Sequence, residues 1–157
     1  VRSPGSTLKP FIYGLAFDDL ALLPDSLIDD RPIRIGDYAP ENFDRGFHGL
    51  VTAREALQQS LNVPAIAQLD RVGPGRLAAT LREAGVRLDF PGNDPAPSLP
   101  LALGGVGINL LDLTRLYAGL AHDGRSAAPH IVEGRTHDAG TLSPAHQGCR
   151  NTEILRA

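Results

Sequence analysis

The chain has 157 residues, of which 42% are apolar and 5% aromatic, and its formal net charge at pH 7 is −3. These values are typical of one globular domain or a large part of one. The mild acidity leaves no basic stripe for a nucleic-acid backbone, which argues against nucleic acid as a partner. No apolar run approaches the roughly 20 residues of a membrane-spanning helix, and no segment resembles a signal peptide.

Helix signals dominate the amino-terminal part of the chain. Residues 3–5 lead into an apolar segment that predicts a helix over residues 6–17, and Pro10 is compatible with it if this residue lies in or near the first turn. That placement puts Ser6 close to the amino end of the helix. Farther along, Thr52–Glu55 is a Thr-x-x-Glu capping box, so a second helix is expected to run to Gln59.

Strand signals are few. Alternating apolar residues predict short strands around residues 33–35 and 131–132. Between the first of these and the capping box, residues 36–49 combine turn-forming residues with aromatic side chains. We expect this segment to be a structured loop that is held in place by burial of its aromatic side chains. These are Tyr38, Phe43 and Phe47.

Two more helices are predicted in the middle of the chain. Pro64 suits the first position of a helix that closes at Gly73. Residues 74–84 repeat the helical pattern, with Gly85 as the stop signal. Residues 92–100 are a proline-rich connection, which we expect to lie within the same domain.

The clearest helical periodicity lies in residues 109–124. Asn109 is the expected N-cap of this helix, and Gly124 its expected end. A Ser-Pro start predicts a final helix over residues 143–157, and Gly148 is the one residue in it that disfavours a helix. The buried face of the helix at 109–124 is expected to carry Leu110, Leu113, Leu116, Tyr117 and Leu120.

Lys9 is the only lysine among 15 basic residues, and it follows Ser6 by three positions. Residues three apart on a helix lie on one face, so the hydroxyl and the amine would face the same space. A serine hydroxyl needs an adjacent base to become a nucleophile. Lysine can be that base only when it is neutral, with its pKa lowered by about three units, or about 4 kcal/mol. Arginine cannot replace it, because its pKa lies above 12.

A Ser-x-x-Lys spacing also occurs in ordinary pairs on a helix surface, and that reading stays open at this point. A second element is Ser60–Leu61–Asn62, in the break between two predicted helices. Its two polar side chains can point to one side while Leu61 anchors the turn in the core. The turn could therefore bring a hydroxyl and an amide near Lys9 for proton transfer and substrate binding. Alternatively, Asn62 caps the following helix or Ser60 ends the preceding one.

Other residue types point to no further chemistry. The single cysteine, Cys149, allows no internal disulfide, and its polar surroundings favour an incidental thiol. No Gly-x-Ser-x-Gly elbow is present, which argues against a Ser-His-Asp hydrolase. We expect no cofactor and no metal site. The five histidines lack metal-ligand spacing, and we expect each in a loop or at the surface: His48, His122, His130, His137 and His146.

The motifs together resemble those of a known family. Ser-x-x-K and Ser-x-Asn are the first two of the three active-site motifs of the serine penicillin-recognising enzymes. Residues 3–11, 36–65 and 101–125 are similar to the transpeptidase domains of class A penicillin-binding proteins. The resemblance implies the α/β β-lactamase/transpeptidase-like fold for the whole domain. This chain would be its mostly α-helical part, with few short strands.

The resemblance also implies roles for four residues. Ser6 would be the acylated nucleophile, Lys9 its proton acceptor, Ser60 a proton shuttle toward the leaving amine, and Asn62 a ligand of the substrate's peptide group. The implied reaction is D,D-transpeptidation of peptidoglycan stem peptides that end in D-Ala–D-Ala, on the periplasmic side of the bacterial inner membrane. β-Lactams would acylate Ser6 as mimics of the donor peptide.

One departure from the family pattern bears on the extent of the domain. The third motif, Lys-Thr/Ser-Gly, is missing, because Lys9 is the only lysine. We therefore expect residues 1–157 to be a partial transpeptidase domain without that strand, the flanking sheet strands or a membrane anchor. Such a fragment would be inactive or weakly active by itself, since loss of one oxyanion donor alone costs about 100- to 1000-fold.

Two other functions remain open from the sequence. One is a β-lactam hydrolase of the same fold, which would need a base for the deacylating water that the sequence does not place. The other is a non-catalytic helical binding or scaffold module, in which the pairing of Ser6 and Lys9 has no chemical role.

Overall fold

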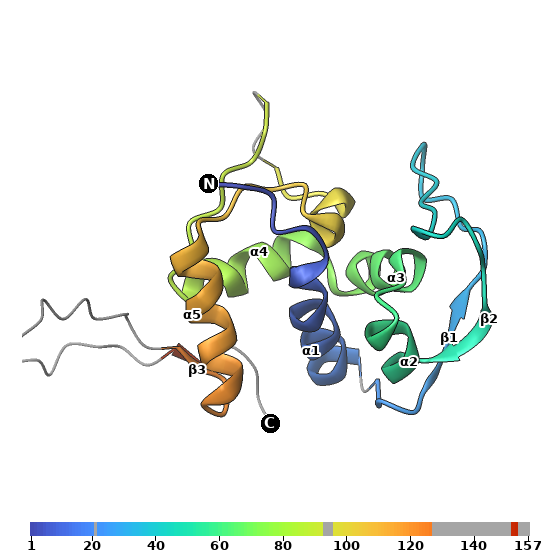
Figure 1. Cartoon of the computed structure of the whole chain (residues 1–157), viewed down its shortest axis with the longest axis horizontal. Coiled ribbons are helices and arrows are strands. Elements are labelled where there is room, and N and C mark those ends of the chain that lie inside the picture. Colours follow the sequence, from blue (N-terminus) through green and yellow to red (C-terminus); the bar gives the residue numbers. More distant parts are fainter. Residues whose placement is uncertain (21, 93–95, 127–151, 154–157) are drawn as a thin grey trace, which may run out of the picture.

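The computed structural model describes residues 1–20, 22–92, 96–126 and 152–153. Helix α1 (Lys9–Leu20) lies in the middle of the molecule and packs against α3 (Asn62–Val72) (Figure 1). A short 3₁₀ helix, η1 (Gly5–Leu8), leads directly into α1. The predicted helix at 6–17 is therefore confirmed in its main part. Pro10 is the second residue of α1, where no helical hydrogen bond is lost.

Residues 11–16 of helix α1 are apolar on all sides because they separate two halves of the core. One half contains α3, α4 (Pro74–Glu83), η2 (Leu99–Leu103) and α5 (Leu110–Ala121). The other contains α2 (Ala53–Gln58) and the strand pair described below. A helical segment that is buried on every face is apolar all round, as residues 11–16 are, whereas the exposed Asp18 and Asp19 lie near the end of the helix. Its fully or nearly fully buried apolar residues are Phe11, Ile12, Tyr13, Leu15 and Ala16.

The helices from 53 to 84 follow the sequence signals closely. Thr52 accepts a hydrogen bond from Glu55 N, and the Glu55 side chain accepts from Thr52 N, so the predicted capping box is confirmed. Helix α3 begins at Asn62, two residues before Pro64. Gly73 separates α3 from α4, as predicted.

Strands β1 (Leu27–Asp30) and β2 (Gly49–Thr52) form an antiparallel pair in which Ile28 lies opposite Val51. The sequence signals did not predict either strand, because each has only four residues. The strand predicted around residues 33–35 is wrong. Ile35 and Tyr38 instead exchange backbone hydrogen bonds across a tight turn, in which Gly36 takes the left-handed conformation (φ +59°).

The loop from 36 to 49 is ordered, but its aromatic side chains do not hold it. Phe43 is fully exposed and Phe47 is 40% exposed, so the predicted burial is wrong for both. Only Tyr38 packs partly against the core. Two polar residues of this region are buried, Asn42 in the loop and Asp30 at the end of β1. Hydrogen bonds between them fix the loop.

Helix α5 has the predicted N-cap, since the Asn109 side chain accepts a hydrogen bond from Asp112 N. Leu116 is buried and Leu113 and Leu120 pack partly on the core, whereas Leu110 and Tyr117 are 78% and 40% exposed. The predicted buried face is therefore only partly correct.

The carboxyl-terminal prediction is corrected where the structure describes it. Thr152–Glu153 forms strand β4, which pairs with β3 (Arg125–Ser126), instead of part of a helix. A β-branched residue at 152 favours extended pairing. The remainder of residues 143–157 lies outside the described residues, as do Cys149, the strand predicted at 131–132 and the three histidines after residue 126. None of the helices in the described part is long and apolar enough to cross a membrane.

Candidate active site

Four segments that are distant in the sequence meet at one pocket of about 420 Å³. Ser6 belongs to η1 and is exposed, whereas Lys9, the first residue of α1, is only 1% exposed. Ser60 and Asn62 lie at the turn from α2 to α3. The residues that line the pocket are Gly5, Ser6, Phe43, Gln59, Ser60, Asn62 and Leu103.

The Lys9 amine lies against the Ser60–Asn62 turn. Its Nζ donates to the Ser60 carbonyl (2.5 Å), the Ser60 hydroxyl (3.1 Å) and Asn62 Oδ1 (2.8 Å). These acceptors are uncharged, and no carboxylate is among them. Burial lowers the pKa of Lys9 from 10.5 to about 8, because desolvation disfavours the ammonium form. About a tenth of the amine is then neutral at pH 7 and about half at pH 8, against well under 1% for a lysine with a pKa of 10.5.

The turn that contacts Lys9 is built as the sequence indicated. Leu61 is 5% exposed and packs in the half of the core next to α2. Ser60 adopts the left-handed conformation (φ +55°), which is uncommon for a residue with a side chain and clusters at functional sites. This conformation lets both the carbonyl and the hydroxyl of Ser60 face the amine. Asn62 does not cap α3 with its side chain; the side chain binds Lys9 instead.

Ser6 and Lys9 are on one face, but they are not joined directly. Among the described residues, no hydrogen bond links the Ser6 hydroxyl to Lys9 Nζ, and the hydroxyl is open to the pocket. Catalytic hydrogen bonds are often long without substrate and shorten when it binds. The arrangement places a free hydroxyl beside an amine whose proton affinity is reduced.

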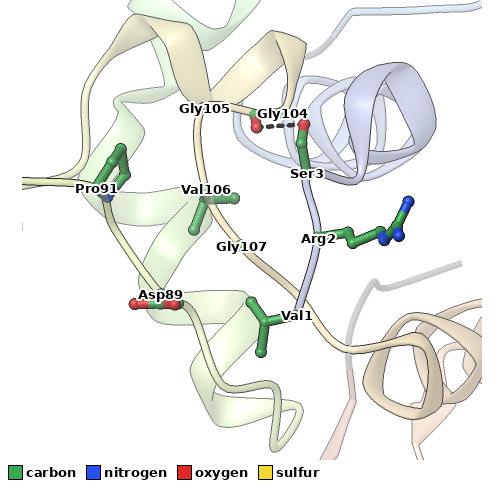
Figure 2. Close-up of a pocket in the computed structure, with 9 residues that line it drawn as sticks. All are labelled: Val1, Arg2, Ser3, Asp89, Pro91, Gly104, Gly105, Val106 and Gly107. Atoms are coloured by element: carbon green, nitrogen blue, oxygen red, sulfur yellow. Dashed lines mark hydrogen bonds between the residues drawn. The ribbon is translucent and has the colours of Figure 1, made fainter.

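The turn that carries Ser6 is held by the segment around Gly104. Ser3 Oγ donates to the Gly104 carbonyl (2.7 Å), and Gly5 N donates to Ser3 Oγ (3.3 Å). Figure 2 shows this contact at the edge of a second pocket, where the amino-terminal segment runs beside residues 104–107. Arg2 and Ile108 exchange backbone hydrogen bonds there (3.0 and 2.9 Å), which fixes the approach to η1.

Helix α5 supports the same turn from the other side. The Tyr117 hydroxyl donates to the Thr7 carbonyl (2.8 Å), and its ring meets Phe11 edge to face at 5.6 Å. This contact explains why Tyr117 stays partly exposed although the sequence placed it on the buried face. Tyr117 thus ties η1 and the first turn of α1 to α5.

The sequence reasoning missed two residues beside the site. Asn42 and the buried Asp30 are hydrogen bonded to each other, and Asn42 also contacts the start of α3. The available signal was weak: an Asp at an inward-facing position of a short strand, and an Asn within a run of turn-forming residues.

Of the two histidines in the described part, His48 pairs with Asp30 and His122 with the Ala118 carbonyl. No group of three or more metal-binding side chains occurs among the described residues.

Comparison with known proteins decides the family. Residues 1–153 match the model of the penicillin binding protein transpeptidase domain. The chain belongs to the penicillin-binding protein transpeptidase family. It is 51% identical to penicillin-binding protein 1C of Escherichia coli K12 over 126 residues, which are 80% of this chain and 16% of that protein. It is 32% identical to penicillin-binding protein 1F of Bacillus subtilis over 150 residues, which are 94% of this chain and 20% of that protein.

Solved structures confirm the expected transpeptidase fold. The crystal structure of penicillin-binding protein 1A from Haemophilus influenzae matches 82% of this chain and 19% of its own, with a TM-score of 0.72 and 31% identity. PonA1 of Mycobacterium tuberculosis in complex with penicillin V has a TM-score of 0.77 at 22% identity and matches 98% of this chain and 43% of its own. The chain spans about a fifth or less of the curated relatives' length.

Proposed function

We propose that this chain supplies the nucleophile and the general base of a serine-type peptidoglycan D,D-transpeptidase. The observation that carries the proposal is the buried Lys9 amine, which is held by three uncharged acceptors beside the open Ser6 hydroxyl. Membership of a transpeptidase family makes acyl transfer the reaction class. In relatives of this kind, the substrates would be peptidoglycan stem peptides, and β-lactams would act as inhibitors.

Acylation begins when the Ser6 hydroxyl oxygen attacks the carbonyl carbon of the D-Ala–D-Ala bond. The hydroxyl proton passes to neutral Lys9, while the carbonyl π bond opens to an oxyanion. When the tetrahedral intermediate collapses, the C–N bond breaks and D-alanine leaves. The nitrogen of the leaving D-alanine takes its proton from the Lys9 ammonium through the Ser60 hydroxyl. That hydroxyl lies 3.1 Å from Lys9 Nζ.

Transfer to the second peptide reverses these steps. An amine of a neighbouring stem peptide attacks the acyl carbon of the Ser6 ester and gives up a proton toward Lys9, and Ser6 regains its hydroxyl proton. Asn62 is the proposed ligand of the donor's peptide group, because its side chain lines the pocket beside Ser6. Its Oδ1 binds Lys9, so its amide links substrate binding to the base.

We further propose that residues 1–157 are part of a larger transpeptidase domain, anchored at the periplasmic side of the inner membrane in the full-length protein. The Lys-Thr/Ser-Gly strand, which the family uses to bind the substrate carboxylate, would then lie elsewhere in that protein. The described residues support this proposal, since they form the helices around the site and only two short pairs of strands.

Mass spectrometry after treatment of the full-length protein with a fluorescent penicillin tests the nucleophile. We expect one penicillin adduct, located on the peptide that contains Ser6, and none in Ser6→Ala. Ser98→Ala is the matched control, because Ser98 is also exposed and its side chain makes no capping hydrogen bond; it should be labelled like the unaltered protein. Labelling of Ser6→Ala, or no adduct in the unaltered protein, would contradict the proposal and favour a scaffold role.

The lifetime of the same adduct separates a transpeptidase from a β-lactam hydrolase. A hydrolase must place a base that activates water against the acyl-enzyme. Among the residues that the structure describes, the side chains that line the pocket include no carboxylate and no histidine. We therefore expect the adduct to persist for hours, and loss within seconds would assign the protein to the hydrolases.

A further inference from the structure

The first turn of α3 has no cap from its own segment. The N-cap residue is Leu61, whose side chain has no acceptor, so the first backbone N–H groups of the helix need a partner from elsewhere. Asn42 supplies it. Its Oδ1 accepts from Asn62 N (2.8 Å) and from Val63 N (3.2 Å), although it lies 20 residues earlier in the chain.

The orientation of the Asn42 amide is fixed by a buried carboxylate. Asn42 Nδ2 donates to both oxygens of Asp30, at 2.8 and 2.9 Å, and to the Gly46 carbonyl (2.9 Å). A carboxylate accepts hydrogen bonds and an amide nitrogen donates them, so the amide oxygen must face α3. The Asp30 side chain is fully buried. Its Oδ2 also accepts a hydrogen bond from the backbone N of His48 (2.9 Å) and lies 2.8 Å from His48 Nδ1.

The residue before Asn42 orients the Asn62 side chain. Asn62 Nδ2 donates to the Glu41 carbonyl (2.9 Å), which leaves Asn62 Oδ1 facing Lys9 Nζ at 2.8 Å. Residues 41–42 therefore fix both the backbone and the side chain of Asn62. Within the Ser60–Asn62 turn the polar side chains are those of Ser60 and Asn62, and both contact the amine.

We propose that Asn42, oriented by Asp30, is a positioning residue that sets the distance between Asn62 and the Lys9 amine. It caps α3 from outside, which leaves the polar side chains of the Ser60–Asn62 turn available to Lys9. This inference rests on the proposed acylation of Ser6. It adds a requirement that neither the Ser-x-x-Lys nor the Ser-x-Asn motif contains.

Acylation kinetics of the full-length protein with a fluorescent penicillin test this role. In Asn42→Ala we expect the acylation rate to fall about 10- to 100-fold, which is the effect of a displacement of about 1 Å in a catalytic site. The pH midpoint of acylation should fall by about half a unit or more. The reason is that Nζ loses one of its three acceptors, and a hydrogen bond that favours the ammonium form raises the pKa of a lysine. Loss of stability alone would not move that midpoint.

A matched control separates positioning from general destabilisation. Leu81→Val removes one methylene from the buried face of α4, away from the pocket. At a temperature where both variants are fully folded by circular dichroism, it should acylate at the unaltered rate and with the unaltered midpoint. An unchanged midpoint in Asn42→Ala, or an equal rate loss in Leu81→Val, would overturn the proposal.

Exchange of the two polar residues gives a second, independent test. Asn42→Asp places two carboxylates against each other, so acylation should fall at least as far as in Asn42→Ala. Adding Asp30→Asn restores one donor and one acceptor at this contact and should recover most of the rate. No recovery in the folded double variant would contradict the proposed orientation. If the unaltered protein itself forms no adduct, the proposed function fails instead.

Discussion

Lys9→Arg is expected to reduce penicillin acylation of the full-length protein by about 100- to 10,000-fold, the range of a lost general base. The arginine side chain keeps the positive charge but cannot give up its proton at any working pH. The Lys9 amine is 1% exposed and makes no ion pair among the described residues, so its charge alone has no evident structural purpose. The measurement is the second-order rate constant for labelling by a fluorescent penicillin.

Two further variants make this result interpretable. Arg54→Lys exchanges the same two residue types at an exposed ion pair with Asp25, and it should leave labelling unchanged. Because Lys9 is almost fully buried, the larger guanidinium has little room, and circular dichroism must show that the variant is folded. Lys9→Met has a side chain of similar length without charge and should also fail to acylate. Labelling at the normal rate in a folded Lys9→Arg variant would refute Lys9 as the base.

Gly104→Ala is expected to destabilise the protein by about 2–4 kcal/mol and to slow acylation, through strain at the turn that carries Ser6. A Cβ at this position would overlap Gly5 N and lie 2.5 Å from Ser3 Oγ and 2.6 Å from Gly5 Cα. Two of these atoms belong to the backbone, so the turn itself would have to move. The residue also has φ +86°, which side chains disfavour. Thermal unfolding and the labelling rate measure the two effects.

Gly36→Ala is the matched control for backbone conformation. Gly36 also has a positive φ, of +59°, but an added Cβ would meet nothing within 4 Å. It should therefore lose only the smaller conformational part of the stability, about 1 kcal/mol, and label normally. Equal effects of the two substitutions would show that the close approach of Gly104 to Gly5 is unimportant.

The helices of the domain could be predicted from the sequence because their signals are local. The capping box at Thr52, the N-cap at Asn109 and the breaks at Gly73 and Gly85 act within one or two turns of the chain. Strands β1 and β2 could not be predicted in this way, since each is four residues long and is defined by its partner. The burial of Tyr117 was misjudged because its hydroxyl binds the Thr7 carbonyl, a contact between distant segments.

In the candidate site, too, the residues that belong to local sequence motifs could be predicted, and those that act through tertiary contacts could not. Ser6, Lys9, Ser60 and Asn62 belong to short motifs with fixed spacing. In the structure Ser6, Ser60 and Asn62 line one pocket, and the buried Lys9 amine binds the last two. Asn42 and Asp30 have no such spacing, because they act through tertiary hydrogen bonds that a single sequence does not reveal. Phe43 was assigned to the core on its hydrophobicity, but the loop is held by polar contacts and the ring is left at the rim of the pocket.

The lowered pKa of Lys9 has consequences of known sign. The base form increases as the pH rises through about 8, so acylation should increase up to that pH and then level off. The folded state binds the proton less tightly than the unfolded state, whose lysine pKa is near 10.5. Stability should therefore rise with pH between about 8 and 10.5, and Lys9→Met should remove this rise.

The most direct test of the account is titration of the Lys9 amine by NMR in the full-length protein, with Lys9→Arg used to assign its signal. The account predicts a midpoint near pH 8, well below the value of an exposed lysine. An amine that is still protonated above pH 10 would contradict it, because Ser6 would then have no base.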